Sequence, residues 1–353
     1  MSNICILSLD FQDYCEPILN LGGYTVDIVK TDSEGHAKRY IEELEHLPDA
    51  LLIAGGDGTV SEVVTGLLRR SDGSKCPLGI LPVGRSNDTA KSYFHLSQKP
   101  SNVKQADELA RTALTVLKGN KQKKNLLKIQ PISEEGETKR PVYALSQFHW
   151  GAFRDVKSLQ DKYWYYGPFR QYAAVFFNCL SKKLTWDCEA ELQVTPPCSG
   201  CRNCYLEEVE SSPEANGNGR WWGRYVPKAP KKGVQSVDYS KVINEDCVTT
   251  TSGSVKSSEV VITPNSESPA RLHLETAPSV EPGIDFIKES WSRIIVKENE
   301  LVPASVVEGR TITLVPQTEE KYTDKYFYID NEEYEVRPVK ISLIPNAFDV
   351  YTF

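Results

Sequence analysis

The sequence predicts an α/β protein with a doubly wound parallel sheet at its N-terminal end and a β-rich, sandwich-like C-terminal part. Three observations support this fold class. Apolar runs that suit buried strands alternate with amphipathic helical patterns as far as residue 118. Glycine-containing turns directly follow two of these apolar runs. Beyond residue 300, polar and apolar residues alternate, which predicts strands joined by hairpins.

Four strands and four helices alternate in the N-terminal part. Residues 50–54 are apolar throughout, as in parallel strands that are buried on both faces. A glycine turn follows, and Thr59 with Glu62 three positions later predicts a capping box with a helix that begins at Thr59. The predicted strands are 3–9, 25–31, 50–54 and 77–82, and the predicted helices are 14–21, 33–47, 59–70 and 106–117.

The composition is that of a globular protein with room for two domains. Of the 353 residues, 40% are hydrophobic and 25% are charged, as in chains that bury a core. The net charge of −7 and the pI of about 5.5 argue against a nucleic-acid-binding surface. No apolar run has the length of a membrane span, and we expect no targeting segment. Nine cysteines, mostly scattered, argue against a secreted disulfide scaffold.

The chain divides into predicted domains of 1–118 and 119–353. Within the second domain, residues 196–283 are rich in Ser, Thr, Pro, Gly, Asn and Glu and lose regular periodicity. This composition predicts a long mobile insertion. Its aromatic and basic run at 221–225 is a candidate membrane or partner contact, or it packs on the body of the protein.

A group of cysteines in this insertion has the spacing of metal ligands. Cys198, Cys201 and Cys204 are each separated by two residues, and Cys188 or Cys247 is a conceivable fourth thiolate. The alternatives are loop thiols without metal and a disulfide. The spacing alone favours loop thiols without metal.

The turn at residues 55–58 has the features of a phosphate site. Gly55, Gly56 and Gly58 let a ligand approach the backbone at the positive end of the following helix. The turn is neither a P-loop nor a dinucleotide fingerprint. Asp57, among the glycines, would repel phosphate unless it holds Mg²⁺ or takes a proton from an acceptor hydroxyl. The alternative is a tight structural turn that Asp57 caps.

The sequence Gly-Gly-Asp-Gly-Thr, followed by Glu62-Val63-Val64, resembles the diacylglycerol kinase catalytic-domain family. That family includes sphingosine, ceramide and acylglycerol kinases, and NAD kinases share the turn. The resemblance implies a catalytic role for Asp57. It also implies nucleotide binding by a set of turn and helix residues: Gly55, Gly56, Gly58, Thr59 and Glu62.

A second turn, after the predicted strand 77–82, resembles another motif of the family. Gly84 and Asn87 match it and are the implied nucleotide contacts, whereas Arg85 and Ser86 replace a threonine and a glycine. The alternative is an Asn-Asp loop with a helix cap.

The aromatic segments at 150–155 and 162–168 resemble acylglycerol kinases in particular. By this resemblance Asp155 would hold the hydroxyl of the lipid substrate, and Arg170 would contact nucleotide phosphate. An alternative for Asp155 is a surface ion pair with a neighbouring cation. The aromatic run at 163–172 suits either a membrane interface or helix core, and we favour core.

A hairpin is predicted near residue 330, between strands that include 311–315 and 339–343. Its tip resembles the family's Asp-Gly-Glu turn, with Asn331 in place of glycine, and Asn tolerates positive φ. Asp330 would be a catalytic base, and Glu332 a nucleotide or metal contact, in the same cleft as the glycine turn. The alternative is an acidic hairpin tip in water.

The resemblance implies an ATP- and Mg²⁺-dependent kinase, associated with mitochondrial membranes, that phosphorylates monoacylglycerol and diacylglycerol. Ceramide or NAD are rival substrates. Residues 8–15 lack the family's Asn-Pro loop, which holds nucleotide. A non-catalytic subunit of a mitochondrial inner-membrane import complex is therefore the alternative function.

Overall fold

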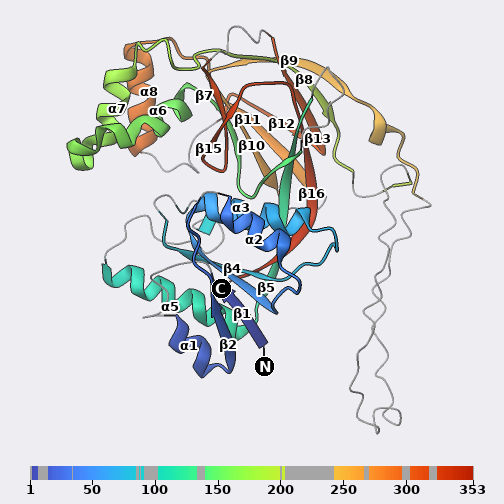
Figure 1. Cartoon of the computed structure of the whole chain (residues 1–353). Coiled ribbons are helices and arrows are strands. Elements are labelled where there is room, and N and C mark those ends of the chain that lie inside the picture. Colours follow the sequence, from blue (N-terminus) through green and yellow to red (C-terminus); the bar gives the residue numbers. More distant parts are fainter. Residues whose placement is uncertain are drawn as a thin grey trace.

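The computed structural model describes most of the chain. The described residues are 2–6, 15–33, 35–84, 87, 89–90, 102–132, 140–198, 201–202, 242–265, 270–295, 303–317 and 324–352. Figure 1 shows an N-terminal α/β unit below and a larger, β-rich part above it, with a group of helices at one side.

The N-terminal unit is a parallel sheet with helices on both faces, as predicted. Its strands pair in the order β2-β1-β3-β4. They are β1 (Ser2–Ile6), β2 (Tyr24–Ile28), β3 (Ala50–Gly55) and β4 (Leu78–Pro82). The helices are α1 (Glu16–Leu21), α2 (His36–Glu43), α3 (Asp57–Arg69) and α5 (Asn102–Lys118).

Strand β3 explains why the sheet is doubly wound. Leu51 and Ile53 point to a core that α2 and α3 complete, whereas Leu52 and Ala54 point to the opposite core, beneath α1 and α5. Successive side chains of a strand face opposite sides, so an apolar run without interruption requires cover on both faces. The carboxyl ends of β3 and β4 therefore carry the two glycine-containing turns at one edge of the sheet.

The N-terminal sheet continues into the C-terminal half through one long strand, β16 (Val339–Tyr351). Near its end, Val350 pairs in parallel with Leu78 of β4. Its earlier part pairs with β13 (Thr311–Pro316), and β5 (Lys121–Pro131) runs antiparallel along most of its length. Beyond β13 lie β8 (Cys188–Thr195) and β9 (Thr251–Ser257). Strand β16 thus pairs with strands on both sides of the domain boundary that the sequence predicted at residue 118.

A second, antiparallel sheet packs against this one. Its order is β12-β11-β10-β7-β14-β15. The strands are β7 (Phe148–Gly151), β10 (Glu259–Asn265), β11 (Arg271–Thr276), β12 (Ser305–Gly309), β14 (Tyr326–Ile329) and β15 (Glu332–Glu335), while β6 (Val142–Ala144) pairs with β5.

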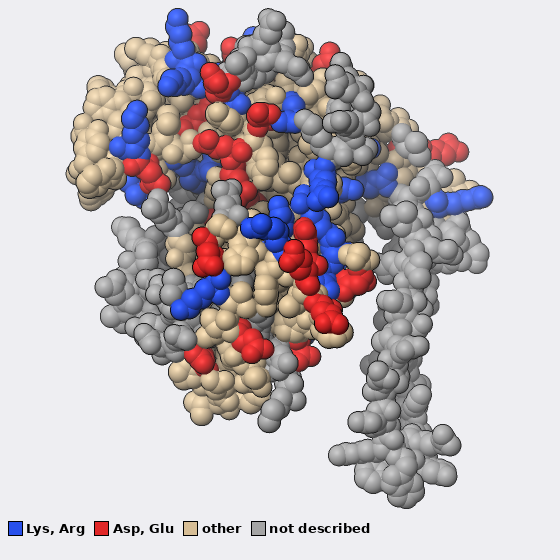
Figure 2. Space-filling view, in the orientation of Figure 1, with Lys and Arg blue, Asp and Glu red and all other residues tan. Residues whose placement is uncertain are grey.

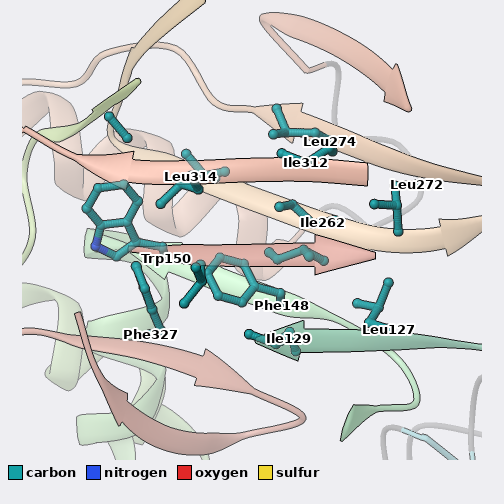
Figure 3. Packing of buried hydrophobic residues seen from close by; sticks show 14 of the residues in the cluster. Leu127, Ile129, Phe148, Trp150, Ile262, Leu272, Leu274, Ile312, Leu314 and Phe327 are labelled. Carbon is teal, nitrogen blue, oxygen red and sulfur yellow. The ribbon is translucent and has the colours of Figure 1, made fainter. Parts of the chain in front are cut away.

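The core between the two sheets is aliphatic with an aromatic centre (Figure 3). The ring of Phe327 lies edge-on to Trp150, with centroids 5.3 Å apart, and 4.9 Å from Phe148. Leu314 and Ile262 approach the same centre from β13 and β10. This core confirms the β-rich, sandwich-like part of the predicted fold.

The predicted mobile insertion at 196–283 is wrong for residues 251–276. Its described residues include β9 in the larger sheet and β10 and β11 in the second sheet. In β11 only Leu272, Leu274 and Thr276 are buried, so each inward apolar residue alternates with a polar one. Such strands have a low apolar content, which made their composition resemble that of a loop. The aromatic run at 221–225 lies outside the described residues.

A helical group caps one end of the second sheet (Figure 1). It consists of α6 (Ala152–Leu159), the 3-10 segment η1 (Gln160–Phe169), α7 (Arg170–Asn178) and α8 (Ile284–Ile295). Ala152, Val156, Ala174 and Phe286 form its core. None of the described helices is long and apolar enough to cross a membrane.

Most of the aromatic run was wrongly expected to be helix core. Tyr163 is buried, but several large side chains of η1 and α7 are exposed: Trp164, Tyr165, Tyr166, Phe169, Phe176 and Phe177. The Gly167 φ of +56° interrupts the helical backbone within η1.

Candidate functional site

The glycine turn leads directly into α3. The helix begins at Asp57. Its N-cap residue, Gly56, has an extended backbone, and no side chain caps the helix at this position. The predicted capping box is wrong, because Glu62 Oε1 accepts a hydrogen bond of 2.8 Å from Gly35 N instead. Glu62 thus ties α3 to the residue before α2, and its predicted nucleotide contact stays a prediction.

Two glycines bring the loops after β3 and β4 into backbone contact. A Cβ on Gly84 would lie 2.2 Å from Gly56 Cα. At Gly55 a Cβ would lie 2.7 Å from the Cβ of Thr59, whose side chain packs over the turn. The turn keeps its shape only without side chains at these positions. The glycines therefore have a structural reason in addition to any approach by phosphate.

Asn87 holds the loop after β4 together. Its Oδ1 accepts from Gly84 N at 2.8 Å, and its Nδ2 donates to Gly84 O at 2.7 Å. The residue has φ of +51°, a conformation that Asn adopts more readily than most residues. These two bonds support the structural alternative for Asn87, and a nucleotide contact stays a prediction.

Asp57 lies at the centre of the site. Its side chain is buried at the first position of α3. Oδ1 accepts from Thr89 N at 2.9 Å, and Oδ2 accepts from Asn331 Nδ2 at 3.0 Å. Asp57 therefore joins the loop after β4 to the hairpin between β14 and β15. The hairpin tip thus contacts the glycine turn through Asn331.

The hairpin tip has the two-residue geometry that the sequence suggested. Asp330 and Asn331 have φ of +45° and +77°, which two-residue turns between twisted strands require. Glu332 Oε1 lies 3.0 Å from the position that a Cβ on Gly58 would take. Its Oε2 accepts from Tyr334 Oη at 3.0 Å. A second carboxylate thus borders the start of α3.

Asp330 points away from the glycine turn. Its carboxylate accepts hydrogen bonds from the backbone N–H groups of Leu145, Ser146 and Gln147 and from Ser146 Oγ. Burial raises the pKa of Asp330, and these donors oppose the rise. Only 1% of the residue is exposed, so the alternative of a solvated tip is wrong. Its surroundings favour a positioning role over that of a catalytic base.

Asp155 lies in a buried polar cluster next to β14. Its Oδ2 accepts from Thr185 N at 2.6 Å, and it also contacts Tyr328, whose hydroxyl is 3.1 Å from Ser158 Oγ. Burial raises the pKa of Asp155 to about 6, against the lowering effect of these hydrogen bonds and of Lys325. The alternative of a surface ion pair is wrong, because Asp155 is 6% exposed.

Arg170 is not brought to the glycine turn. It begins α7, and its guanidinium forms an exposed ion pair with Asp161 at 3.5 Å. Figure 1 shows α7 in the helical group, well apart from α3. The phosphate contact implied for Arg170 stays a prediction.

Several site residues were not found from the sequence. Thr89 contributes a backbone N–H, which any residue offers, so no sequence signal exists. Thr185 and Lys325 surround Asp155 from segments 30 and 170 positions away. Asn331 was noticed for its turn conformation, but its amide contact with Asp57 requires the packing of the two halves.

Comparisons with known proteins agree with this architecture. A model of the diacylglycerol kinase catalytic domain matches residues 8–129, and a model of the acylglycerol kinase C-terminal region matches residues 145–212. Mitochondrial acylglycerol kinase from Homo sapiens is 30% identical over 358 residues, which is 97% of this chain and 78% of that protein. Sphingosine kinase 1 from Mus musculus is 30% identical over 179 residues, 49% of this chain and 45% of that protein.

A solved structure shares the fold. A diacylglycerol kinase from Bacillus anthracis str. Sterne superposes with a TM-score of 0.56 at 15% identity, and covers 99% of this chain and 96% of its own. The fold and the glycine turn define a kinase built on the diacylglycerol kinase catalytic domain, and the relatives support a lipid kinase. Within that class, the extent of the similarity to mitochondrial acylglycerol kinase shows that the chain belongs to the acylglycerol kinase family.

Proposed function

We propose that this chain is an ATP-dependent lipid kinase that phosphorylates the hydroxyl of monoacylglycerol and diacylglycerol. Its products would be lysophosphatidic and phosphatidic acid, and ceramide is a further candidate substrate. The observation that carries the proposal is the meeting of three groups: the N-terminus of α3, the buried Asp57 carboxylate, and Glu332 from the hairpin. Family membership supports the lipid class of the substrate.

The start of α3 suits the phosphates of ATP. Its first N–H groups have no partner within the helix, and the helix dipole favours negative charge there. Gly56 and Gly84 meet backbone to backbone, without side chains of their own at the contact. Phosphates bound here would lie beside Asp57 and Glu332.

The two carboxylates fit the ligand preference of Mg²⁺, which binds oxygen and commonly takes one or two carboxylates in nucleotide sites. Glu332 is our candidate to hold the ion, because its Oε1 borders Gly58 at the start of α3, whereas both oxygens of Asp57 accept from Thr89 and Asn331. When bound, Mg²⁺ neutralises phosphate charge. Asp57 is our candidate to accept the proton of the lipid hydroxyl through Oδ2, once the Asn331 amide moves aside.

The lipid head group would be held by the Asp155 cluster. Tyr328 contacts Asp155 and lies in β14, two positions before the turn residue Asp330. A carboxylate whose pKa is raised to about 6 is well suited to accept a hydrogen bond from a hydroxyl. The proposed lipid and phosphate sites would then border neighbouring parts of one hairpin.

The helical group would rest on a membrane that supplies the lipid, with the mitochondrial membrane as the candidate surface. Trp164 is 74% exposed and Phe169 is 68% exposed. Figure 2 shows few charges at the left edge of the molecule, where α7 lies in Figure 1. Aromatic side chains favour the interface between water and lipid. We expect Trp164→Ala with Phe169→Ala to reduce sedimentation with phospholipid vesicles several-fold, whereas Leu21→Ala on exposed α1 should not; equal binding by all variants would contradict this orientation.

A second function is favoured by one observation. Glu332 places a negative charge beside Gly58, where a nucleotide phosphate would bind. Without a cation this charge opposes ATP. A non-catalytic subunit of a mitochondrial inner-membrane import complex is therefore the alternative.

The two functions separate in one assay. Purified chain is incubated with radiolabelled ATP, Mg²⁺ and vesicles that contain monoacylglycerol, diacylglycerol or ceramide, and labelled lipid is measured. We expect labelled product from the acylglycerols, and loss of product with Glu332→Ala while the fold persists. ATP binding without any labelled lipid would reject the proposed substrates, and absence of both would favour the non-catalytic function.

A further inference from the structure

Three cysteines from two segments that lie far apart in the sequence meet beside the edge of the larger sheet. The Sγ atoms of Cys198, Cys201 and Cys247 all lie within 4.8 Å of one another. Cys201 and Cys247 are 0% and 1% exposed, and Cys198 is partly buried. Of the other cysteines considered from the sequence, Cys188 is directed elsewhere and donates to Trp150 O, and Cys204 lies outside the described residues.

The backbone brings these thiols together from two segments. Cys198 and Cys201 follow β8, and Cys247 lies in η4 (Glu245–Val248), the 3-10 turn that precedes β9. The segments are joined by a hydrogen bond of 2.9 Å from Arg202 N to Val242 O. The packing therefore selects Cys247, which the sequence alone could not distinguish from Cys188.

The spacing of the sulfurs suits a tetrahedral metal ion. Zinc binds thiolate sulfur at about 2.3 Å, so two sulfurs on one ion lie about 3.8 Å apart. A separation within 4.8 Å for all three pairs needs only small shifts to reach that geometry. Two cysteines separated by two residues, with a distant third, also follow the ligand pattern of structural zinc sites. Soft thiolate ligands select zinc over the hard Mg²⁺ of a nucleotide site.

The side chain of Asn244 donates a hydrogen bond to one of the sulfurs. Its Oδ1 accepts from Asp246 N at 3.1 Å, which fixes the orientation of the amide. The other end of the amide, Nδ2, is therefore the donor, and it lies 3.4 Å from Cys198 Sγ. An N–H that points at sulfur stabilises the thiolate, which is the form that binds metal. The side chain thus both shapes the turn of Cys247 and orients Cys198.

We propose that Cys198, Cys201 and Cys247 bind a structural Zn²⁺ ion. The ion ties the segment after β8 to the segment before β9 and so closes the ends of the stretch 203–241. A cross-link of this kind reduces the conformational entropy of the unfolded chain. In the folded protein it holds the edge strands β8 and β9 in register. This proposal replaces the metal-free interpretation that spacing alone favoured, and it does not depend on the kinase activity.

The test is metal content in the whole chain, purified under reducing conditions from cells grown with zinc. We expect elemental mass spectrometry to find about one zinc ion per chain. Cys201→Ser and Cys247→Ser should retain less than about a tenth of it. Cys179→Ser is the matched control, since this partly exposed thiol at the end of α7 lies in another part of the fold. Unchanged zinc in the two site variants would overturn the proposal.

A second measurement works even where a serine variant fails to fold. Wild-type protein is stripped with a chelator and titrated with Co²⁺, and its thiols are then alkylated and located by mass spectrometry. We expect thiolate-to-cobalt absorption and protection of the three cysteines, with Cys179 modified in both states. Absence of the absorption, or a disulfide between Cys198 and Cys201 in the reduced preparation, would refute a zinc site.

Discussion

Gly58 is the residue of the turn at which an added side chain would meet the β14–β15 hairpin. Its φ is not among the positive values, so an added Cβ strains nothing in the backbone. The Cβ would meet only the end of the flexible Glu332 side chain, at 3.0 Å. What glycine provides here is room beside the first N–H groups of α3.

A pair of substitutions at Gly58 separates shape from charge. Gly58→Ala should fold and bind ATP nearly as the unmodified chain does, since alanine favours helix. Gly58→Asp adds a third carboxylate beside Asp57 and Glu332 and should weaken ATP binding by about tenfold or more, equivalent to about 1.4 kcal/mol per factor of ten. Calorimetry measures both affinities. If Gly58→Asp binds ATP with the same affinity as the unmodified chain, the phosphates do not bind at the start of α3.

The buried Asp155 gives folding a pH dependence of known sign. Because burial raises its pKa from 3.8 to about 6, the folded protein binds its proton more tightly than the unfolded chain. The stability that this group contributes is therefore full below pH 3.8 and is lost as pH rises through about 6. The complete change is about 3 kcal/mol, at about 1.4 kcal/mol per pKa unit.

Asp155→Asn removes this titration while its side-chain oxygen can still accept from Thr185 N. The difference in unfolding free energy between wild type and variant should therefore shift in favour of the variant between pH 4 and pH 7. Urea unfolding at several pH values measures it. Ser158→Ala is the control, since it removes the Tyr328 contact without a charge. A difference that stays constant with pH would contradict the buried, pH-sensitive carboxylate.

Among the secondary-structure elements, the β14–β15 hairpin is held by Asp330 within its own half and reaches the N-terminal half through the next two side chains, Asn331 and Glu332. Asp330 binds the loop at 145–147, Asn331 binds Asp57, and Glu332 borders Gly58. The family's glycine at position 331 would form the same turn without the amide. The asparagine thus adds a contact between the halves.

A double-mutant cycle tests that contact. Asp57→Asn should cost about 1–3 kcal/mol, because its new NH₂ group faces the Asn331 NH₂ or loses a bond to Thr89 N. Asn331→Gly should cost about 1 kcal/mol, and the double variant should cost less than the sum. Urea unfolding gives all four free energies. Strict additivity would show that the contact contributes nothing.

The sequence predicted these elements unevenly, for physical reasons. Residues 50–54 could be assigned to a buried strand because unbroken apolar character leaves few other solutions. The hairpin tip was predictable because Asp330 and Asn331 tolerate positive φ. Strands β9 to β11 were missed because only two or three residues of each are buried and because each strand depends on partners distant in sequence. Such pairings, like the neighbours of Asp155, are set by packing and leave no local signal.

At the scale of the molecule, β16 belongs to both hydrophobic cores. Val350 packs in the core of α2, α3 and β3, whereas Ile341 packs between the two sheets. Both are fully buried at opposite ends of one strand. The two halves should therefore unfold together.

Two alanine substitutions in β16 test this coupling. Val350→Ala and Ile341→Ala should each lower stability by about 2–4 kcal/mol, and each should shift the same single transition. Hydrogen exchange followed by mass spectrometry reads both halves, and Lys340→Ala, an exposed neighbour on the strand, serves as control. Two transitions that respond separately to the two variants would show that the halves are independent domains.

The position of β16 has a consequence for the protein while it is being made. Val350 is translated 272 positions after its partner Leu78, which takes roughly 14–54 s at 5–20 residues per second. An arrested nascent chain that ends at residue 330 should lose residues 50–118 to protease faster than a chain that includes β16; equal protection would contradict this order of assembly. Throughout synthesis the edge of β4 stays an open template for other strands. The newborn chain is therefore most open to wrong strand pairing between the synthesis of Leu78 and that of Val350.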